Sequence, residues 1–331
     1  MTGSGGFSAL PREELDLSFV VIGLNEGRTL RACLESVRRA GLEELATELV
    51  YVDGGSDDDS VATAREIADT VLTAETRRRA AENRNLGLKR ARGQFVQFLD
   101  GDMRLAPGWP KAAVGLLEGH PEVAAVFGRL EEHNDSAAYQ ALQIDWECPE
   151  GPALYCGGAA MFRRRDIARA GGFPEDVDFG EEPLLCWTLR NAYGQGVYHL
   201  HETMAEHDLD YGGLRDYWKR NVRCGRTFAE VAHRCRRESE RFWTAEVRSN
   251  LAWGAALVLL LLGLALGPGG WIRAGAALAL AAIWTRKFAQ YARRGKPLGV
   301  AALFAAHTYA AKLGIAWGIL RWKLTGKRGG P

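Results

Sequence analysis

The first hundred residues alternate between short apolar runs and stretches in which apolar residues recur at helical spacing. Apolar runs of strand length occur at 19–24, 48–52, 70–72 and 95–99, and helical spacing occurs at 30–37, 59–68 and 77–92. Strands that alternate with helices predict an α/β domain with a parallel sheet and helices on both faces. Ligands bind such sheets at the carboxyl ends of the strands, where Asn25, Asp53 and Asp100 fall.

The composition changes sharply near residue 249. We predict helices at about 249–267 and 271–285, because both stretches are apolar and the first has no charge over a length that crosses a bilayer core. A Gly-Pro-Gly-Gly turn separates them, so they would form a hairpin in the membrane. The alternative is that both are buried helices of a soluble domain.

A third apolar helix is expected at about 299–320. It carries His307 and Lys312 near its middle, and a lysine at mid-bilayer is costly unless it is paired or lies at the surface. Basic clusters follow the second and third stretches (Arg286, Lys287, Arg293, Arg294 and Lys296; Arg321, Lys323, Lys327 and Arg328). If both clusters are cytoplasmic, the third helix lies in the interface or re-enters rather than crossing.

Length and charge limit the class of protein. The chain has 331 residues, more than one typical domain, and we expect a flexible leader at 1–16, a catalytic domain at 17–235 and a membrane region with a basic tail at 236–331. A formal charge of +1 argues against a nucleic-acid partner. The six cysteines form no Cys-x-x-Cys pair, which indicates reduced thiols rather than disulfides or a zinc site.

Two carboxylates close the strand at 95–99. Asp100 and Asp102 are separated by one glycine, and side chains at i and i+2 on a strand point the same way. Both could therefore face one Mg²⁺ or Mn²⁺ ion that also binds the phosphate oxygens of a diphosphate substrate. The alternative is that both acids are ordinary turn residues.

A second acid, Asp53, ends the strand at 48–52 and opens a Gly-Gly-Ser loop. Glycines let the backbone approach a ligand closely, so Asp53 at the strand end is expected to contact the ligand. The acids at 57–59 that follow suit the start of a helix, and we predict that they are solvated helix caps.

Several segments together resemble the family 2 glycosyltransferases in order and spacing. They are VVIGLNE at 20–26, VDGGSDD at 52–58, NRNLG at 83–87, LDGD at 99–102, GGAAMF at 157–162, GGF at 171–173, GEE at 180–182 and the segment 217–226. The likeness covers about residues 17–230. It implies a GT-A fold, a Rossmann-like nucleotide-diphospho-sugar transferase domain, and transfer of a sugar with inversion.

The resemblance also implies roles on the donor side. Asp53 would bind the nucleoside, assisted by Arg84, and Asn25 and Glu26 would lie in the same donor-binding site. Asp102 would hold Mn²⁺ or Mg²⁺ on the diphosphate, with Asp100 beside the donor's ribose or sugar or as a further metal ligand, and His207 resembles a position that ligates the metal in some related transferases. A divalent cation stabilises the charge that gathers on the leaving diphosphate.

Inversion in one displacement needs a base for the acceptor hydroxyl. The resemblance implies that this base lies in Glu181-Glu182, where Glu182 stands at a position that is usually Asp in the family. Pro183 suits the first turn of a helix to about Asn191, which would hold the acid at the helix start. The alternative is that both acids only complement the helix dipole.

Acceptor contacts are expected at Gly157 and Gly158 and, in the basic and aromatic segment 217–223, at Trp218 and Arg223. This segment lacks the Gln-x-x-Arg-Trp signature of processive synthases, so one sugar per encounter is expected. The helix would alternatively rest on the membrane surface, where Trp, Tyr and Arg are stable.

These observations predict a multi-pass inner-membrane enzyme with a cytoplasmic catalytic domain. A membrane tether suggests a lipid-linked glycan or a glycolipid as acceptor, because confining enzyme and lipid to one surface raises their effective concentration. Two alternatives stay open. A polyprenyl-phosphate sugar synthase would share the donor chemistry, and a non-catalytic membrane scaffold would carry a degenerate transferase domain.

Overall fold

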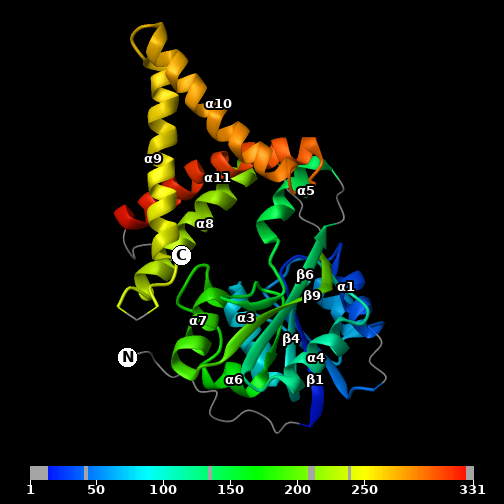
Figure 1. Cartoon of the computed structure of the whole chain (residues 1–331). Helices are drawn as coiled ribbons and strands as arrows, with labels where there is room; N and C mark the ends of the chain where they lie inside the picture. The colour runs from blue at the N-terminus through cyan, green and yellow to red at the C-terminus, as the bar shows by residue number, and fades with distance from the viewer. Residues whose placement is uncertain (1–13, 41–43, 133–135, 208–212, 238–239, 326–331) are drawn as a thin grey trace. The chain divides into compact units, whose positions relative to one another are not determined.

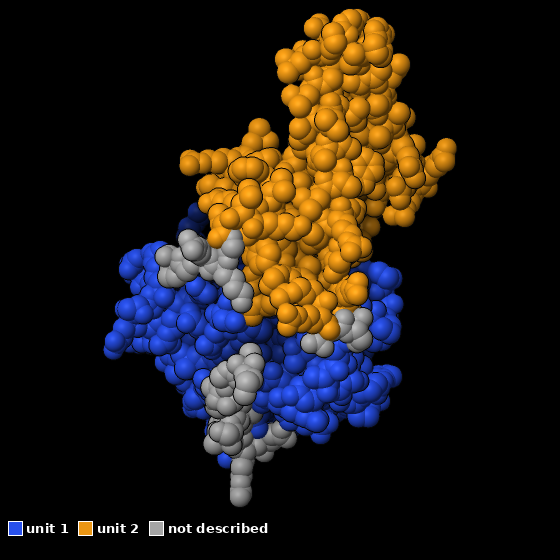
Figure 2. Space-filling view, turned by 90° about the vertical axis from the view of Figure 1, so that its left-hand side faces the viewer, with its two compact units in different colours: residues 1–133, 148–208 blue, residues 134–147, 209–331 orange. Residues whose placement is uncertain are grey.

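The computed structural model describes residues 14–40, 44–132, 136–207, 213–237 and 240–325. The chain packs as two compact units, one made of residues 1–133 and 148–208 and the other of 134–147 and 209–331 (Figure 2). The predicted division at residue 235 differs from this grouping, because the helix at 214–234 and the segment 134–147 pack with the C-terminal helices.

The described part of the first unit contains a nine-stranded mixed sheet (Figure 1). Its order is β3-β2-β1-β4-β8-β6-β9-β5, and β7 also pairs with β9. The strands are β1 (Leu15–Gly23), β2 (Thr47–Asp53), β3 (Thr70–Leu72), β4 (Gly93–Asp100), β5 (Met103–Leu105), β6 (Val123–Glu132), β7 (Gly151–Ala153), β8 (Ala160–Arg163) and β9 (Gly196–His207).

Only part of the sheet has the predicted parallel arrangement. The first four strands pair in parallel, as do β6 and β9. The prediction is thus confirmed for the four strands from which it was made, and the complete sheet is mixed: β8 lies antiparallel between β4 and β6, and β5 and β7 pair antiparallel with β9. The apolar pattern that we used ends at residue 99, before the strands that reverse direction.

Helices cover both faces of the sheet, as predicted. In the first unit they are α1 (Leu30–Arg38), α2 (Ser60–Ile67), α3 (Ala80–Arg90), α4 (Trp109–Gly119), α6 (Arg164–Arg169) and α7 (Glu181–Tyr193). Val21 of β1 packs in one core with α1 and α4, whereas Val20 packs in the other with α3 and α7. Successive side chains of a central strand are thus buried on opposite faces, which explains its uninterrupted apolar run.

Two predicted boundaries shift. Strand β1 begins at Leu15, so Leu15 and Asp16 belong to the sheet, while the rest of the expected leader, except Glu14, lies outside the described residues. Helix α3 begins at Ala80 rather than 77, because the Arg79 amide donates to Glu82 Oε2 (2.7 Å) and so marks the helix start.

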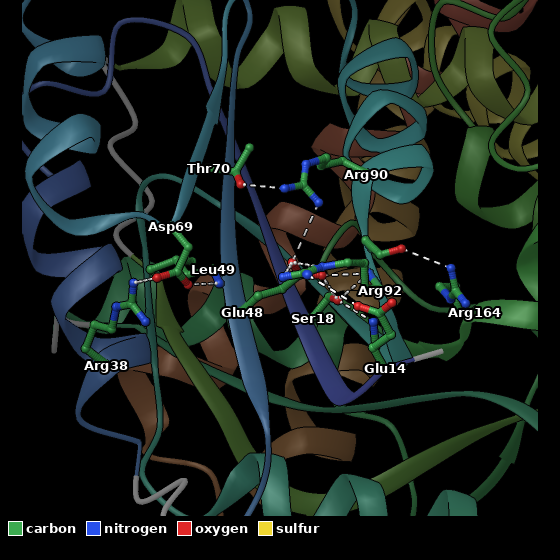
Figure 3. A network of polar contacts seen from close by, with 12 residues as sticks. Glu14, Ser18, Arg38, Glu48, Leu49, Asp69, Thr70, Arg90, Arg92 and Arg164 are labelled. Atoms are coloured by element: carbon green, nitrogen blue, oxygen red, sulfur yellow. Dashed lines mark hydrogen bonds and ion pairs between the residues drawn. The ribbon is translucent and has the colours of Figure 1, made fainter. Parts of the chain in front are cut away.

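A buried polar cluster closes the amino ends of the central strands (Figure 3). We define the Glu48 cluster as Ser18, Glu48 and Arg92. Glu48 is 3% exposed, and its Oε1 accepts hydrogen bonds from Ser18 Oγ (2.7 Å) and the Arg92 amide (2.6 Å). Arg92 Nε donates to Glu48 Oε2 (3.1 Å), so both carboxylate oxygens are satisfied.

The second unit is helical in its described part. It contains α5 (Ala137–Gln143), the 3₁₀ helix η1 (Ile144–Trp146), α8 (Leu214–Arg234), α9 (Thr244–Leu266), α10 (Gly270–Ala292) and α11 (Leu298–Thr325). Helices α8 and α11 approach closely at glycines: Gly225 lies against Ile315, and Gly318 lies against Val222. A Cβ at either glycine would collide with the opposite backbone, so these small residues set the spacing of the two helices.

Among the residues that the structure describes, two helices, α9 and α11, are long and apolar enough to cross a membrane. Only 17% of the apolar window of α9 is buried, which is unlike the core helix of a soluble protein. Helix α10, the expected second arm of the hairpin, continues through Arg286 and Lys287 and does not meet the same criterion. The hairpin and the interfacial position of α11 therefore stay predictions.

The polar residues of α11 have partners within the second unit. Lys312 Nζ donates to Asn250 Oδ1 of α9 (2.8 Å). His307 lies 2.7 Å from Tyr217 Oη of α8 through Nδ1 and 2.7 Å from Asp145 Oδ2 through Nε2. The segment 134–147 is thus tied to α11 by a polar contact as well as by apolar packing of Ile144 on Phe304.

Candidate functional site

The ends of β1, β2 and β4 lie side by side. Gly23 is in register with Asp53, and Ile22 is in register with Asp100. The loops that follow are joined to one another, because the Asn25 amide donates to Ser56 Oγ (2.9 Å) and the Asp57 amide donates to Asn25 Oδ1 (2.8 Å). The sheet therefore brings the predicted donor-side residues to one edge.

Asp53 organises the loop that it opens. Its Oδ2 accepts hydrogen bonds from the amides of Gly55 and Ser56, both at 2.9 Å, and the residue is only 2% exposed. Gly55 has φ +96°, a conformation that favours glycine. The side chain fixes the loop backbone, and a direct contact with a donor stays a prediction.

Of the acids after this loop, Asp58 bonds the first residue of α2, whereas the Asp59 side chain makes no capping hydrogen bond. Asp58 Oδ1 accepts hydrogen bonds from the Ser60 hydroxyl (2.5 Å) and amide (3.0 Å), and its Oδ2 accepts from the Gly27 amide (2.9 Å). The Ser60 hydrogen bond, with help from these amides, lowers the pKa of Asp58.

Arg84 of α3 lies at the centre of a cluster of carboxylates that we define as the Arg84 cluster: Arg84, Asp100, Glu181 and Glu182. Its Nη2 donates to Asp100 Oδ1 (2.9 Å). Its Nη1 donates to Glu181 Oε1 (3.1 Å) and to Glu182 Oε1 (3.0 Å). The Arg84 side chain is 4% exposed, so one buried cation serves three carboxylates that come from β4 and α7.

This imbalance shifts pKa values. Burial raises the pKa of Glu182 to about 7; Arg84 lowers it, and the charge of Glu181 adds to the increase. Burial disfavours the charged form of Arg84, but Asp100, Glu182 and Glu181 outweigh it and raise the Arg84 pKa. Glu182 is therefore a carboxylate that accepts a proton near neutral pH while Arg84 remains charged.

The Arg84 guanidinium is held from two further sides. Its carbon lies 5.6 Å from the centroid of the Phe173 ring. Phe173 is fixed by α3, because its amide donates to Asn85 Oδ1 and its carbonyl accepts from Asn85 Nδ2, both at 2.8 Å. Gly158 closes the other approach, because a Cβ there would collide with Arg84 Nη2 and lie 3.3 Å from Asp100 Oδ2.

Asp102 has surroundings different from those of Asp100. Its Oδ2 lies 3.5 Å from His207 Nε2, and the pairing of β5 with β9 brings the two residues together. Its Oδ1 is buried and has no hydrogen-bond partner among the described residues. Burial, and next the charge of Asp102, raises the pKa of nearby Glu26. This corner is acidic and holds an unsatisfied carboxylate oxygen.

These groups suit a hard divalent cation, which binds carboxylate oxygen and imidazole nitrogen and completes its shell with water and phosphate oxygens. Within the part of the chain that the structure describes, no three His, Cys, Asp or Glu residues gather into a metal site. Asp102 and His207 would thus provide two protein ligands, while Asp100 Oδ1 is already paired with Arg84.

The remaining predicted residues divide between the two units. Trp218 and Arg223 lie on α8 in the second unit, and the Trp218 side chain is 43% exposed. Gly157 has open space, because a Cβ there would meet no described atom within 4 Å.

Asn83 is a further polar residue near the site that the motifs assigned no role. This residue is 4% exposed, its Oδ1 has no partner in the described chain, and its amide nitrogen lies beside Gly54. The sequence signal that could have pointed to Asn83 is that it is a polar residue directly before Arg84 on the buried face of α3.

Comparison with known proteins agrees with the resemblance. Residues 18–169 match the family model described as Glycosyl transferase family 2. The pre-mycofactocin glycosyltransferase of Mycobacterium tuberculosis strain ATCC 25618 / H37Rv is 33% identical over 218 residues, which cover 59% of this chain and 45% of that protein. The chain thus spans less than half the length of this curated relative.

Two solved structures share the fold. One is the mannosyltransferase PcManGT from Pyrobaculum calidifontis in complex with GDP-Man and Mn²⁺, with a TM-score of 0.60 and 20% identity over 97% of this chain and 90% of that one. The other is S. aureus TarS 1-349 in complex with UDP-GlcNAc, with a TM-score of 0.50 and 16% identity over 89% of this chain and 90% of that one. The predicted α/β GT-A fold is confirmed.

Proposed function

Because this chain carries a glycosyltransferase family 2 domain, we propose that it is an inverting glycosyltransferase that moves one sugar from a nucleotide diphosphate sugar to an acceptor hydroxyl. One observation carries the proposal. A buried carboxylate with a pKa of about 7, Glu182, is joined through Arg84 to Asp100 at the ligand-binding edge of the sheet.

On the donor side, the joined loops that carry Asn25, Glu26 and Asp53 would hold the nucleoside, and Asp100 would contact the ribose or sugar. The neighbouring structures contain GDP-Man and UDP-GlcNAc, which supports a nucleotide sugar as donor. Asn83, which is buried with an unsatisfied oxygen beside Gly54, would add a polar contact to this side.

Asp102 and His207 would hold Mn²⁺ or Mg²⁺, since they place an unsatisfied carboxylate oxygen and an imidazole at one corner. When bound, this ion would stabilise the negative charge that develops on the leaving diphosphate. Mn²⁺ in the neighbouring mannosyltransferase supports the assignment.

Glu182 would accept the proton of the acceptor hydroxyl as that oxygen attacks the sugar from the face opposite the diphosphate. Its raised pKa fits this role, because a general base works best with a pKa near the operating pH. Glu181 accepts a hydrogen bond from the same Arg84 nitrogen and would help to hold the guanidinium in place.

We further propose that the acceptor is associated with a membrane, as a lipid-linked glycan or a glycolipid. Two helices that could cross a bilayer support a multi-pass inner-membrane protein with its catalytic unit in the cytoplasm. Gly157, Gly158, Trp218 and Arg223 would contribute to acceptor binding. A tether that shares the acceptor's membrane would raise the effective concentration of the acceptor.

The test uses the full chain in detergent micelles with UDP- and GDP-sugars, with and without Mn²⁺. A donor should raise the unfolding temperature in a metal-dependent manner, because a ligand that binds only the folded state stabilises it. Slow hydrolysis of that donor, followed by NMR, should first release the sugar with inverted anomeric configuration. Retention of configuration, or no binding of any nucleotide sugar, would overturn the proposal, and the latter would favour a non-catalytic scaffold.

A further inference from the structure

We infer that Arg84 is a positioning residue of the transfer reaction: it holds the base Glu182 at a fixed place relative to Asp100 on the donor side. The resemblance implies only that Arg84 assists nucleoside binding. The inference rests on the proposed function and adds a residue that links the base to the donor side of the site.

The hydrogen bonds of Arg84 divide between the two sides of the site. Nη1 contacts both glutamates of α7, at 3.1 and 3.0 Å, while Nη2 contacts Asp100 of β4 at 2.9 Å. A guanidinium is planar and rigid, so its two terminal nitrogens keep a constant separation. A shift of Glu182 relative to Asp100 would therefore break at least one of these charge-assisted hydrogen bonds.

The guanidinium itself has little freedom to move. Phe173 lies over it at 5.6 Å, and Asn85, one residue after Arg84 on the same helix, holds the backbone of Phe173 by two hydrogen bonds of 2.8 Å. Gly158 fills the remaining side so closely that a single methyl group would displace Nη2. The surrounding residues thus fix the Arg84 guanidinium, which in turn fixes Glu182.

The geometry also favours a link to the base over a link to the nucleoside. The Arg84 side chain is 4% exposed, and both of its terminal nitrogens are occupied by carboxylates. Nε is buried without a partner in the described part of the chain. A group so enclosed acts on a donor through Asp100 rather than by direct contact.

Lysine could not replace this residue, because an ammonium carries the charge but lacks the fork that reaches three carboxylates. Arg84→Lys therefore separates charge from geometry. We expect Arg84→Lys to lower the rate of donor hydrolysis by about 100-fold, the usual cost of misplacing a reacting group, and to leave the donor dissociation constant within about threefold. Arg39→Lys, at an exposed ion pair between Glu35 of α1 and the residue that follows this helix, is the matched control and should behave as the wild type.

Gly158→Ala displaces the guanidinium without changing Arg84. It should lower hydrolysis as Arg84→Lys does, whereas Gly115→Ala, in open space on α4, should not. A loss of donor affinity with an unchanged rate constant would assign Arg84 to donor binding and overturn the inference, as would near-normal hydrolysis in both variants. If Arg84→Lys does not fold, Gly158→Ala against Gly115→Ala decides alone. A wild-type chain that hydrolyses no donor would instead overturn the proposed function.

Discussion

The Glu48 cluster and the Arg84 cluster lie at opposite ends of the central strands, and both pair an arginine with carboxylate: Glu48 is the buried partner in the first, and Arg84 is the buried partner in the second. In the first, every oxygen of the single carboxylate accepts a hydrogen bond. In the second, one arginine faces three carboxylates and burial raises the pKa of one of them to about 7. The balanced cluster holds strands together, whereas the unbalanced one is poised to exchange a proton.

The largest expected effect is on the rate of transfer, and it tests whether the Arg84 cluster is the one that exchanges a proton. Glu182→Gln removes the proposed base, so transfer to a hydroxyl acceptor should fall by about 10³-fold, within the usual contribution of general base catalysis. The unfolding temperature should stay constant or rise, because one of three competing carboxylates is gone. Steady-state kinetics and thermal unfolding measure both, with Glu118→Gln, at an exposed position of α4, as the control. Near-normal turnover with a lipid phosphate acceptor would favour a polyprenyl-phosphate sugar synthase.

Loss of the carboxylate from the Glu48 cluster should instead lower the stability of the protein and leave its activity unchanged. Glu48→Ala leaves the buried Ser18 hydroxyl and the Arg92 amide without their acceptor, and we expect a loss of about 3 kcal/mol of stability. Hydrolysis per folded molecule should not change. Thermal unfolding compared with activity at low temperature tests this, and a specific loss of activity with normal stability would show that the Glu48 cluster is more than structural.

Loss of the Asp102 charge, at the proposed metal site, should have an intermediate effect on donor binding. Asp102→Asn keeps the size of the side chain but removes the charge, so the Mn²⁺-dependent part of the donor's thermal shift should disappear and donor affinity should fall by about 10- to 100-fold. Isothermal titration of nucleotide diphosphate with and without Mn²⁺ measures this. A metal effect that survives in the variant would place the ion elsewhere.

The dependence of the reaction rate on pH should show whether Glu182 of the Arg84 cluster exchanges a proton. Because burial raises the Glu182 pKa to about 7, the base is protonated and inactive at lower pH and charged at higher pH. The rate should therefore fall about tenfold per pH unit below about 7 and level off above it. Donor binding measured across the same range serves as the reference, and a flat profile would mean that another group limits the reaction.

The smallest effect concerns Ser18. Ser18→Ala removes the hydroxyl that donates to Glu48 and accepts from the Gly93 amide (2.8 Å), and should cost about 1 kcal/mol of stability. The change in unfolding temperature measures it. An unchanged unfolding temperature would show that water replaces the hydroxyl and that the cluster is less closed than its hydrogen bonds indicate.

The sequence contained much of the fold and the location of the site. The apolar runs near residues 20, 50 and 97 predicted parallel neighbours, and residues at their ends, Asn25, Asp53 and Asp100, duly lie at one edge. Local patterns suffice there, because parallel strands in register bring equivalent ends together. The order of several short motifs agrees with the match of residues 18–169 to the model of glycosyl transferase family 2.

Other features were beyond local patterns. The antiparallel position of β8 depends on how the chain returns to the sheet, and the Arg84 cluster joins residues 16, 97 and 98 positions apart. The burial of Asp53 depends on its loop folding back onto its own carboxylate. In each case the decisive contact is made by tertiary packing, to which hydrophobic periodicity is blind.

The excursion of residues 134–147 makes the two units hard to separate. Since the chain enters the helical unit there, returns at 148 and leaves again at 209, the backbone passes from one unit to the other three times. A truncation after residue 208 would remove α8 and α11 and leave Ile144 and Asp145 without the residues that cover and bind them. A soluble catalytic fragment would therefore need an internal deletion as well as a new C-terminus.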